Sequence, residues 1–478
     1  MQKEHSLNLF IENKWIFFIL ILFIGIITPF QPALPILFIL LFYSFYLFSK
    51  SITTLFSYFI FLLILQPTIF YNLQYFGGSR AIASIVNRSD EIIGMFMLVL
   101  LIIKRFEYNR WEIRLTGFEF SVIIFVLWGL ITMLINGLNI IWSLISIFLT
   151  MKGFFYYLLG KNLEVSEGKI EEHFNRLVKF LLIIFFIGFL QYIGLPLPFL
   201  PTVERFGIRA ATSVFGHHAY FGLVMGMTYA ISIGIYLGTR KKIWLLYSFL
   251  FMLGVIMSSV RKSLVGLILG TLFTLLFYRK LKIDKKDIYY GIAIILIIFV
   301  AFYGRIVALV KGTDKEYVKD VGANRRILLY YGAYKILKNK PITGEGPGRY
   351  GTYVSVVTKS DVYIKYGVEM EDMYKVDTFW AAIAGEYGIP GIILMLFYLF
   401  SFFRNILKMV NSDIKNNFIR GLVIGHLILF VDILIESSTL GLFNLSLPVY
   451  YLFGGTALID NFIFKYSHKS DEFYKEKI

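Results

Sequence analysis

Five arginines stand in sequence contexts that suit a bound anion. Arg261 lies in the stretch MSSVRKSLVG, Arg325 and Arg326 begin NRRILLYYGAYKILKNKP, and Arg205 and Arg209 lie in VERFGIRAATSVFGHHAYFG. A guanidinium fork matches two phosphate oxygens at once. Arg325 and Arg326 would occupy the first turn of a helix, where the free N–H groups and the helix dipole already favour an anion. The set predicts a phosphate or diphosphate site, although interfacial anchoring would explain any single arginine.

Three further residues could transfer a proton. His217 and His218 follow Arg205 and Arg209 in VERFGIRAATSVFGHHAYFG, and Asp377 is the first residue of DTFWAAIAGEYGIPG. A carboxylate or an imidazole within reach of a sugar hydroxyl could act as its general base. Aspartate is also a favoured helix N-cap, so Asp377 has a purely structural interpretation as well. Both interpretations stay open.

The composition predicts the kind of scaffold that must position these groups. The 478 residues are 58% hydrophobic and contain no cysteine, and mean hydropathy is +0.71. Long charge-free runs of this kind indicate membrane spans. The lack of cysteine excludes disulfides, thiolate metal sites and a cysteine nucleophile. The net charge of +16 is typical of cytoplasmic loops in a membrane protein, so we expect no nucleic-acid partner. We also expect no metal and no cofactor.

Apolar runs of spanning length recur along the whole chain, each near the ~20 residues that a bilayer requires. They lie at 14–30, 33–49, 52–70, 89–103, 118–135, 139–160, 178–194, 214–238, 243–259, 263–278, 287–308, 379–401, 418–436 and 442–463. The sequence therefore predicts an all-α polytopic integral membrane protein of about 12–14 transmembrane helices, forming a single membrane domain over residues 1–478.

The orientation follows from the basic residues, because Lys and Arg are retained in cytoplasmic loops. With the N-terminus inside, the basic segments 104–114, 161–179, 239–242, 279–286 and 404–420 all fall on the cytoplasmic side, as does the C-terminal tail. The same parity places one long polar loop, 311–377, outside. The candidate arginines, histidines and Asp377 would all face outward, giving an extracytoplasmic site.

This long loop carries two patterns of its own. Ile327, Tyr330, Tyr331, Tyr334 and Leu337 recur at helical spacing, which predicts an amphipathic helix of about four turns lying on the membrane. Tyr330 lies one turn beyond Arg326 and is expected beside the substrate.

The second pattern is KPITGEGPGRYGTY, in which Gly346, Gly348 and Gly351 fit G-x-G-x-x-G. That motif indicates dinucleotide binding only between a strand and a helix. No strand-forming run precedes it, and a nucleotide pool is absent outside the cell. The glycines therefore predict tight turns with positive φ in a packed loop, with Gly346 near the substrate.

Ionisable residues also interrupt the apolar runs. Asp432 and Glu436 lie four residues apart on one helix face, and Lys152 stands in LTMKGFF. Such groups are costly in a membrane unless they are paired or face an aqueous cavity. They could form a structural ion pair or the floor of the outer site.

Three stretches resemble the O-antigen ligase and polymerase superfamily, between about residue 200 and residue 395. MSSVRKSLVG is similar to a Ser-rich motif whose arginine falls on Arg261. NRRILLYYGAYKILKNKPITGEGPGRYG is similar to an Arg, aromatic, Ala, Pro and Gly-x-Gly pattern that places the family arginine on Arg326. DTFWAAIAGEYGIPG is similar to a His-Asn segment that continues with Glu386, Gly388 and Gly391. The sequence departs from the family at the His and Asn positions, where Asp377 and Thr378 stand.

The resemblance implies a GT-C-like glycosyltransferase that uses undecaprenyl-diphosphate-linked glycans, inverts the anomeric centre and needs no metal. The arginines would hold the diphosphate leaving group, where charge develops in the transition state. The location implied is the bacterial cytoplasmic membrane, with both termini cytoplasmic and with a flippase and a chain-length regulator as partners.

Because the ligases are the branch most associated with the missing histidine, Asp377 favours a polysaccharide polymerase. A ligase that passes the glycan to a terminal acceptor such as lipid A core stays open. A flippase or transporter is the non-enzyme alternative, but the related halves with broken helices that it predicts are not evident. If Asp377 is only a cap, His217 or His218 becomes the candidate base.

Overall fold

The computed structural model describes residues 52–75, 80–107, 117–163, 167–195, 203–205, 208–277, 325–368 and 378–464. These ranges are almost entirely helical, and six of their helices are long and apolar enough to cross a membrane, or seven if one bent pair forms a single span. The expectation of an all-α polytopic membrane protein is confirmed. The spans predicted at 14–30, 33–49 and 287–308 lie outside the described residues.

The centre of the fold is a group of closely packed helices: α10 (His218–Thr239), α11 (Lys242–Ser258), α12 (Arg261–Phe277) and α18 (Asn417–Glu436). Glycines set the distance between α10 and α18. A Cβ on Gly234 would lie 2.3 Å from the amide nitrogen of Gly425 and 2.5 Å from the carbonyl oxygen of Gly421. Small residues let helix backbones approach closely where apolar burial gives no advantage over lipid.

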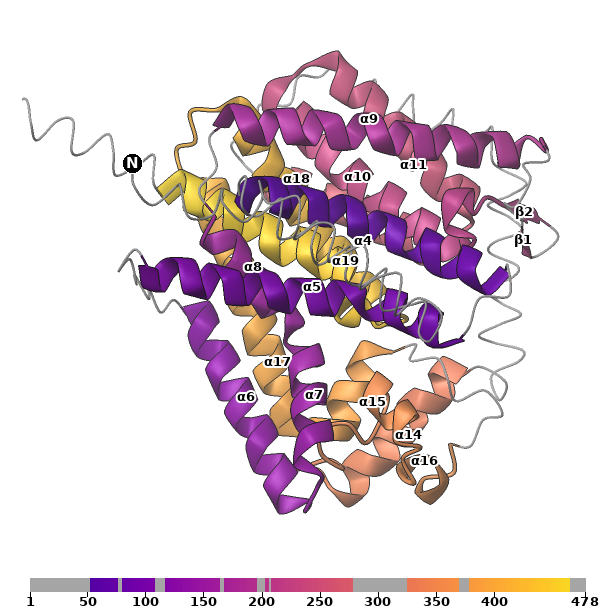
Figure 1. Cartoon of the computed structure of the whole chain (residues 1–478), viewed down its shortest axis with the longest axis vertical. Helices are drawn as coiled ribbons and strands as arrows, with labels where there is room; N and C mark the ends of the chain where they lie inside the picture. The colour runs from indigo at the N-terminus through magenta and orange to yellow at the C-terminus, as the bar shows by residue number, and fades with distance from the viewer. Residues whose placement is uncertain are drawn as a thin grey trace, which may run out of the picture.

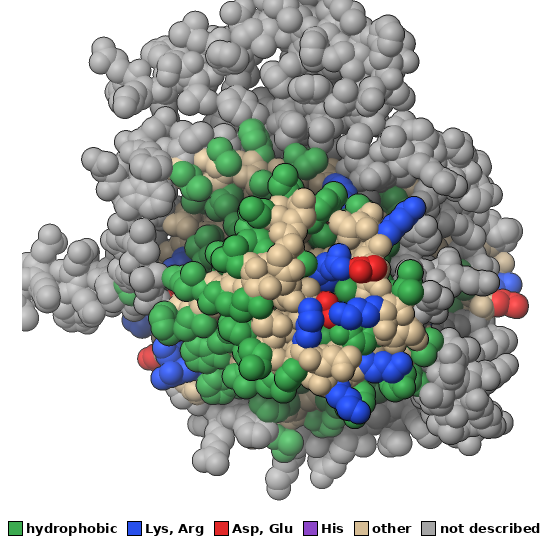
Figure 2. All heavy atoms as spheres, turned by 90° about the horizontal axis from the view of Figure 1, so that it is seen from below, with side chains coloured by type: hydrophobic (Ala, Val, Ile, Leu, Met, Phe, Trp, Pro, Cys, Tyr) green, Lys and Arg blue, Asp and Glu red, His purple; other side chains and the backbone are tan. Residues whose placement is uncertain are grey.

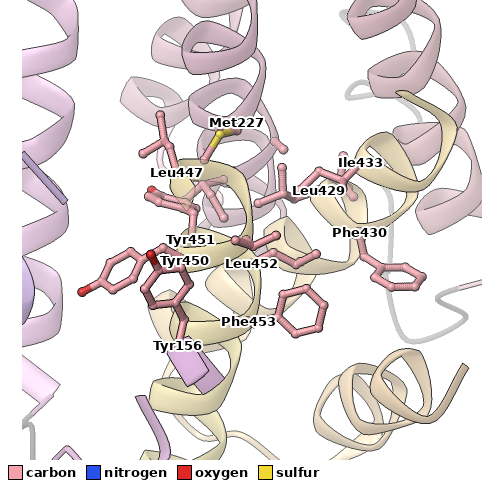
Figure 3. Close-up of a cluster of buried hydrophobic side chains, with 14 of the residues drawn as sticks. Tyr156, Met227, Leu429, Phe430, Ile433, Leu447, Tyr450, Tyr451, Leu452 and Phe453 are labelled. Carbon is pink, nitrogen blue, oxygen red and sulfur yellow. The ribbon is translucent and has the colours of Figure 1, made fainter. Parts of the chain in front are cut away.

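Further helices surround this centre (Figure 1): α4 (Ile52–Tyr75), α5 (Arg80–Glu107), α9 (Glu167–Tyr192) and α19 (Ser446–Val449). The last continues through a π-helical turn, η5 (Tyr450–Gly454), to Phe464. Figure 3 shows Tyr450 of this turn beside Tyr156, with ring centroids 5.1 Å apart. A Cβ on Gly160 would lie only 2.1 Å from the Gly454 carbonyl oxygen, so the widened turn is packed directly on a neighbouring helix.

That neighbour, α8 (Lys152–Lys161), meets α7 (Ile140–Thr150) at a bend of 56°. The sequence predicted one span over 139–160, and the structure breaks it at Met151. Lys152 begins the second half and is buried, with its Nζ 3.1 Å from Ser446 Oγ and 3.7 Å from Glu91 Oε1. It therefore forms a structural ion pair with α5, one of the two roles that the sequence left open.

The span predicted at 379–401 extends over α17 (Phe379–Asn411), which packs along α6 (Gly117–Ile135). The helix is broken at Gly388, whose φ of 67° and ψ of −166° are not helical. A Cβ there would lie 2.3 Å from the carbonyl oxygen of Ile342. Glycine is required because of both its conformation and this contact.

The described part of the long polar loop, residues 325–368, forms a compact unit that we call the loop module. It contains α14 (Arg325–Asn339), α15 (Tyr353–Val357) and α16 (Val362–Lys365). The helix predicted in this loop is confirmed as α14, and its position on the membrane stays a prediction. Its buried face carries Leu329, Gly332, Ala333 and Ile336. The tyrosines Tyr330, Tyr331 and Tyr334 point outward, with 38%, 50% and 62% of their surface exposed.

The remaining elements are short. A two-stranded antiparallel hairpin pairs β1 (Val203–Arg205) with β2 (Ile208–Ala210), and 3-10 turns lie at η1 (Ser213–Phe215) and η4 (Leu442–Asn444). The hairpin is tied to the central helices because the amide of Ala211 donates to the carbonyl oxygen of Met257, 3.0 Å away, near the end of α11.

Candidate active site

The Ser-rich stretch forms a two-residue reversal between α11 and α12. Ser259 has a φ of 59°, in the left-handed region, and ends α11. The amide of Val260 donates to Ser258 Oγ across 3.3 Å. Gly222 of α10 leaves no room on the other side, since a Cβ there would lie 2.5 Å from the same Oγ. The turn fixes Arg261, half-buried, as the first residue of α12.

The residue after this arginine is held by a buried carboxylate. Lys262 Nζ lies 3.8 Å from Glu436 Oε2, and the glutamate side chain is only 2% exposed. Asp432 lies one turn earlier on α18, and its Oδ1 would be 2.2 Å from a Cβ on Gly266 of α12. The two helices are therefore pressed together at this end, and the ion pair positions the first turn of α12.

The loop module reaches the same place. The Tyr330 hydroxyl donates to the carbonyl oxygen of Ser438 across 2.7 Å. Trp380, at the start of α17, donates through Nε1 to Ser437 Oγ across 3.1 Å. These two serines directly follow Glu436, and Arg326 lies one helical turn before Tyr330 on α14. Helices α12, α14 and α17 therefore meet at the C-terminal end of α18. We call Arg261, Lys262, Arg326, Tyr330 and Glu436 the convergence site.

A second buried carboxylate joins the loop module to α17. Glu386 accepts hydrogen bonds at Oε1 from Thr352 Oγ1 (2.6 Å) and from the Tyr350 amide (3.1 Å). Its Oε2 accepts from Ser146 Oγ of α7, 3.3 Å away. The glutamate is fully buried. We call these four residues the Glu386 clasp.

The glycine motif also forms a backbone hydrogen bond with Glu386. The Gly346 amide donates to the Glu386 carbonyl oxygen across 2.9 Å. Gly346, Gly348 and Gly351 all have positive φ, with values of 87°, 82° and 67°. This confirms the prediction of tight turns in a packed loop. The structure places Gly346 in the interior, where a Cβ would lie 2.4 Å from Leu138 Cδ1.

Glu345, next to the motif, is surrounded by donors. Lys365 Nζ and the Tyr366 hydroxyl each lie 2.7 Å from Oε1, and Lys340 Nζ lies 3.2 Å from Oε2. Burial alone would raise the pKa of Glu345, but hydrogen bonds from Lys365, Tyr366 and Lys340 lower this pKa below its ordinary value. The carboxylate is ionised at neutral pH and links α14, the glycine loop and α16.

The other predicted residues that the structure describes lie on α14, on the β1–β2 hairpin and at the start of α10. Arg325 is the first residue of α14, beside Arg326. Arg209 is exposed on β2, and Arg205 ends β1 but its side chain is not among those described. His217 caps α10 and stacks on His218, with ring centroids 5.0 Å apart. Asp377 lies outside the described residues, directly before the buried Thr378 that precedes α17.

Sequence reasoning did not single out Lys262 as a site residue, and it gave Glu386 no structural task. Each has a weak local signal. Lys262 adjoins an arginine at a helix start, and Glu386 is a lone carboxylate in an apolar segment. Their partners Glu436 and Thr352 lie far away in the chain, so neither pairing is visible from spacing.

The fold is that of a multi-pass membrane protein in which α12 and α14, the helices that begin with Arg261 and Arg325, both contact the C-terminal end of α18. Residues 246–396 match the family model described as O-antigen ligase. The matched stretch contains Arg261, Arg326, the glycine motif and the kinked start of α17. The match confirms the resemblance to the O-antigen ligase and polymerase superfamily over these residues, and this family implies an enzyme of the glycosyl-transfer kind. No curated protein matches the chain.

Proposed function

We propose that this protein is a polysaccharide polymerase of the bacterial cytoplasmic membrane. It would transfer a growing glycan from undecaprenyl diphosphate onto the sugar of an incoming lipid-linked repeat unit. The reaction would take place at the outer face of the cytoplasmic membrane. The observation that carries the proposal is the convergence site. Two arginines from segments 65 residues apart, Arg261 and Arg326, begin helices that both contact the C-terminal end of α18.

In this reaction the arginines bind the diphosphate of the donor. The acceptor hydroxyl oxygen attacks the anomeric carbon, and the bond from that carbon to the diphosphate oxygen breaks with inversion. The electron pair stays on the departing lipid diphosphate, where Arg261 and Arg326 stabilise the developing charge without a metal. The ion pair of Lys262 with Glu436 holds the first turn of α12, and with it Arg261, against the end of α18.

The hydroxyl proton goes to a general base, which we assign to Asp377. The residue is three positions before Trp380, whose indole contacts Ser437 beside the convergence site. The assignment rests on this nearness in sequence to Trp380 and on the position of Asp377 in the family motif. Arg325, Tyr330, Arg205, Arg209, His217 and His218 would line the donor and acceptor glycans, with the histidines as the substitute base.

A ligase is the second candidate, because the matching family model carries that description. The two activities leave different products. In a strain that lacks this protein, a missing polymerase leaves single repeat units on the lipid, whereas a missing ligase leaves intact polymer on the lipid.

Mass analysis of the lipid-linked glycans measures this directly, with a strain complemented by Arg326→Ala as the test of the site. We expect single units to accumulate in both strains. Long lipid-linked chains would assign the protein as a ligase, and normal polymer from the Arg326→Ala strain would remove the convergence site from the mechanism.

A further inference from the structure

A group of basic side chains lies on the loop module. It consists of Lys335, Lys338, Lys340, Arg349, Lys359 and Lys365, which we call the cationic face. Figure 2 shows Lys and Arg side chains gathered on this part of the molecule, with few acidic ones among them. Between residues 335 and 365 the only acidic residues are Glu345 and Asp361, so the segment carries a formal charge of +4.

Internal ion pairs neutralise only part of this charge. Glu345 is shared by Lys340 and Lys365, and Asp361 is paired with Arg349. Both acidic groups are thereby engaged. Lys338 and Lys359 remain exposed on the surface. A positive excess held at a folded surface attracts counter-charge from outside the chain.

Exposed aromatic and aliphatic side chains accompany the lysines. Tyr331, Tyr334, Lys335 and Lys338 stand at positions i, i+3, i+4 and i+7, so they share a stripe along α14. Lys335 Nζ lies 4.4 Å from the Tyr331 ring centroid. Tyrosines interleaved with cations on one helix face are typical of the level where lipid headgroups meet the hydrocarbon region.

The cationic face directly adjoins an apolar surface. At the turn between α6 and α7, Leu134 and Ile141 are 70% and 68% exposed. Lys340 joins the two surfaces, since its Nζ donates to Asn136 Oδ1 in that turn across 2.8 Å. Figure 2 shows apolar side chains next to the Lys and Arg group. A soluble polyanion would not require this border, whereas a bilayer covers the apolar part and presents its headgroups to the basic part.

We propose that the cationic face is a docking surface for anionic phospholipid headgroups in the adjoining leaflet. Phosphate oxygens contact Lys338, Lys359 and their basic neighbours, and Tyr331 and Tyr334 lie at the boundary with the acyl chains. Docking sets the depth of α14 in the membrane, and with it the depth of Arg325 and Arg326. The proposal does not depend on the reaction that the protein catalyses.

The chain contains no cysteine, so a single one reports on this surface alone. We propose Tyr334→Cys, labelled with an environment-sensitive nitrobenzoxadiazole dye, in nanodiscs of phosphatidylcholine with or without phosphatidylglycerol. We expect the emission to move to shorter wavelength when phosphatidylglycerol is present and to return when salt is raised, because salt screens exposed charges. Adding Lys338→Glu and Lys359→Glu should abolish the shift.

The matched control changes the same charge elsewhere. Lys241 and Lys242 are exposed at the turn between α10 and α11, and Lys241→Glu with Lys242→Glu should leave the dye response intact. Emission that ignores lipid composition would overturn the proposal, as would equal responses in the two double variants. A shift produced by soluble dextran sulfate in phosphatidylcholine discs would also overturn it, because the face would then bind a soluble polyanion.

Discussion

The central helices and the loop module are held together by different physical means. Helices α10 and α18 touch through their backbones, and Gly234, Gly421 and Gly425 leave no space between them. The loop module is attached to α17 and α7 by hydrogen bonds to the buried carboxylate of Glu386. The bundle should therefore be sensitive to added volume. The loop module should instead be sensitive to the loss of hydrogen-bond acceptors and to the protonation of its carboxylates.

Added volume between α10 and α18 should destabilise the bundle itself. Gly234→Ala places a Cβ within 2.5 Å of three backbone atoms of α18 that cannot give way. We expect a loss of about 1–3 kcal/mol or more from overpacking. The measurement is the thermal midpoint of the purified protein in detergent.

Gly168→Ala is the matched control, because it also lies in a helix and its Cβ would meet nothing within 4 Å. It should be neutral or slightly stabilising, since alanine is the better helix former. Equal midpoints for the two variants would show that α10 and α18 are not in backbone contact.

Removal of the Glu386 carboxylate should release the loop module and leave the bundle folded. Glu386→Ala strands buried donors at Thr352, Tyr350 and Ser146, at about 1–3 kcal/mol for each group left unsatisfied. We expect faster amide hydrogen exchange across 344–356 and unchanged protection in α10 and α18. Ser146→Ala, which removes only the longest of these bonds, is the milder comparison. Uniform loss of protection over the whole chain would contradict the separation of the two regions.

Acid should loosen the module by a smaller amount, through Glu345. Its pKa is lower in the folded protein than in the unfolded chain, so its stabilising effect is present above the unfolded pKa of about 4.3 and is lost as pH falls through the lower, folded pKa. Hydrogen exchange of 335–366 should therefore accelerate below about pH 4.3, in excess of the intrinsic pH effect. Glu345→Gln should show the faster exchange already at pH 7 and lose this pH dependence. An identical pH response in wild type and variant would remove Glu345 as the cause.

The same contrast explains what the sequence could predict. Apolar runs marked most of the described helices within a few residues, because spanning length depends on local composition. The break at Met151 was missed, since LTMKGFF contains no proline and the bend coincides with the pairing of Lys152 to Glu91 and Ser446. Asp432 and Glu436 were recognised as sharing a face, but their partner on α12 depends on tertiary packing that periodicity does not encode.

Within the site, the arginine segments and the glycine turns were recognisable because each motif is local. The convergence of Arg261 and Arg326 on the end of α18 was not, because it depends on contacts of Tyr330 with Ser438 and of Lys262 with Glu436, 108 and 174 residues apart. The matched family segment ends at residue 396, so α18 and its two carboxylates lie beyond it.

In the proposed reaction the convergence site binds the diphosphate leaving group. The most direct test is the turnover of lipid-linked repeat units by purified Arg326→Ala and Arg326→Lys, with Lys241→Ala as a control that removes a positive charge from the exposed turn between α10 and α11. We expect the alanine variant to lose at least ~10²-fold in turnover, because a contact that stabilises charge in the transition state is lost. The lysine variant should recover part of it, because an ammonium keeps the charge but not the fork. Wild-type turnover by a folded Arg326→Ala protein would show that Arg326 does not stabilise the diphosphate leaving group.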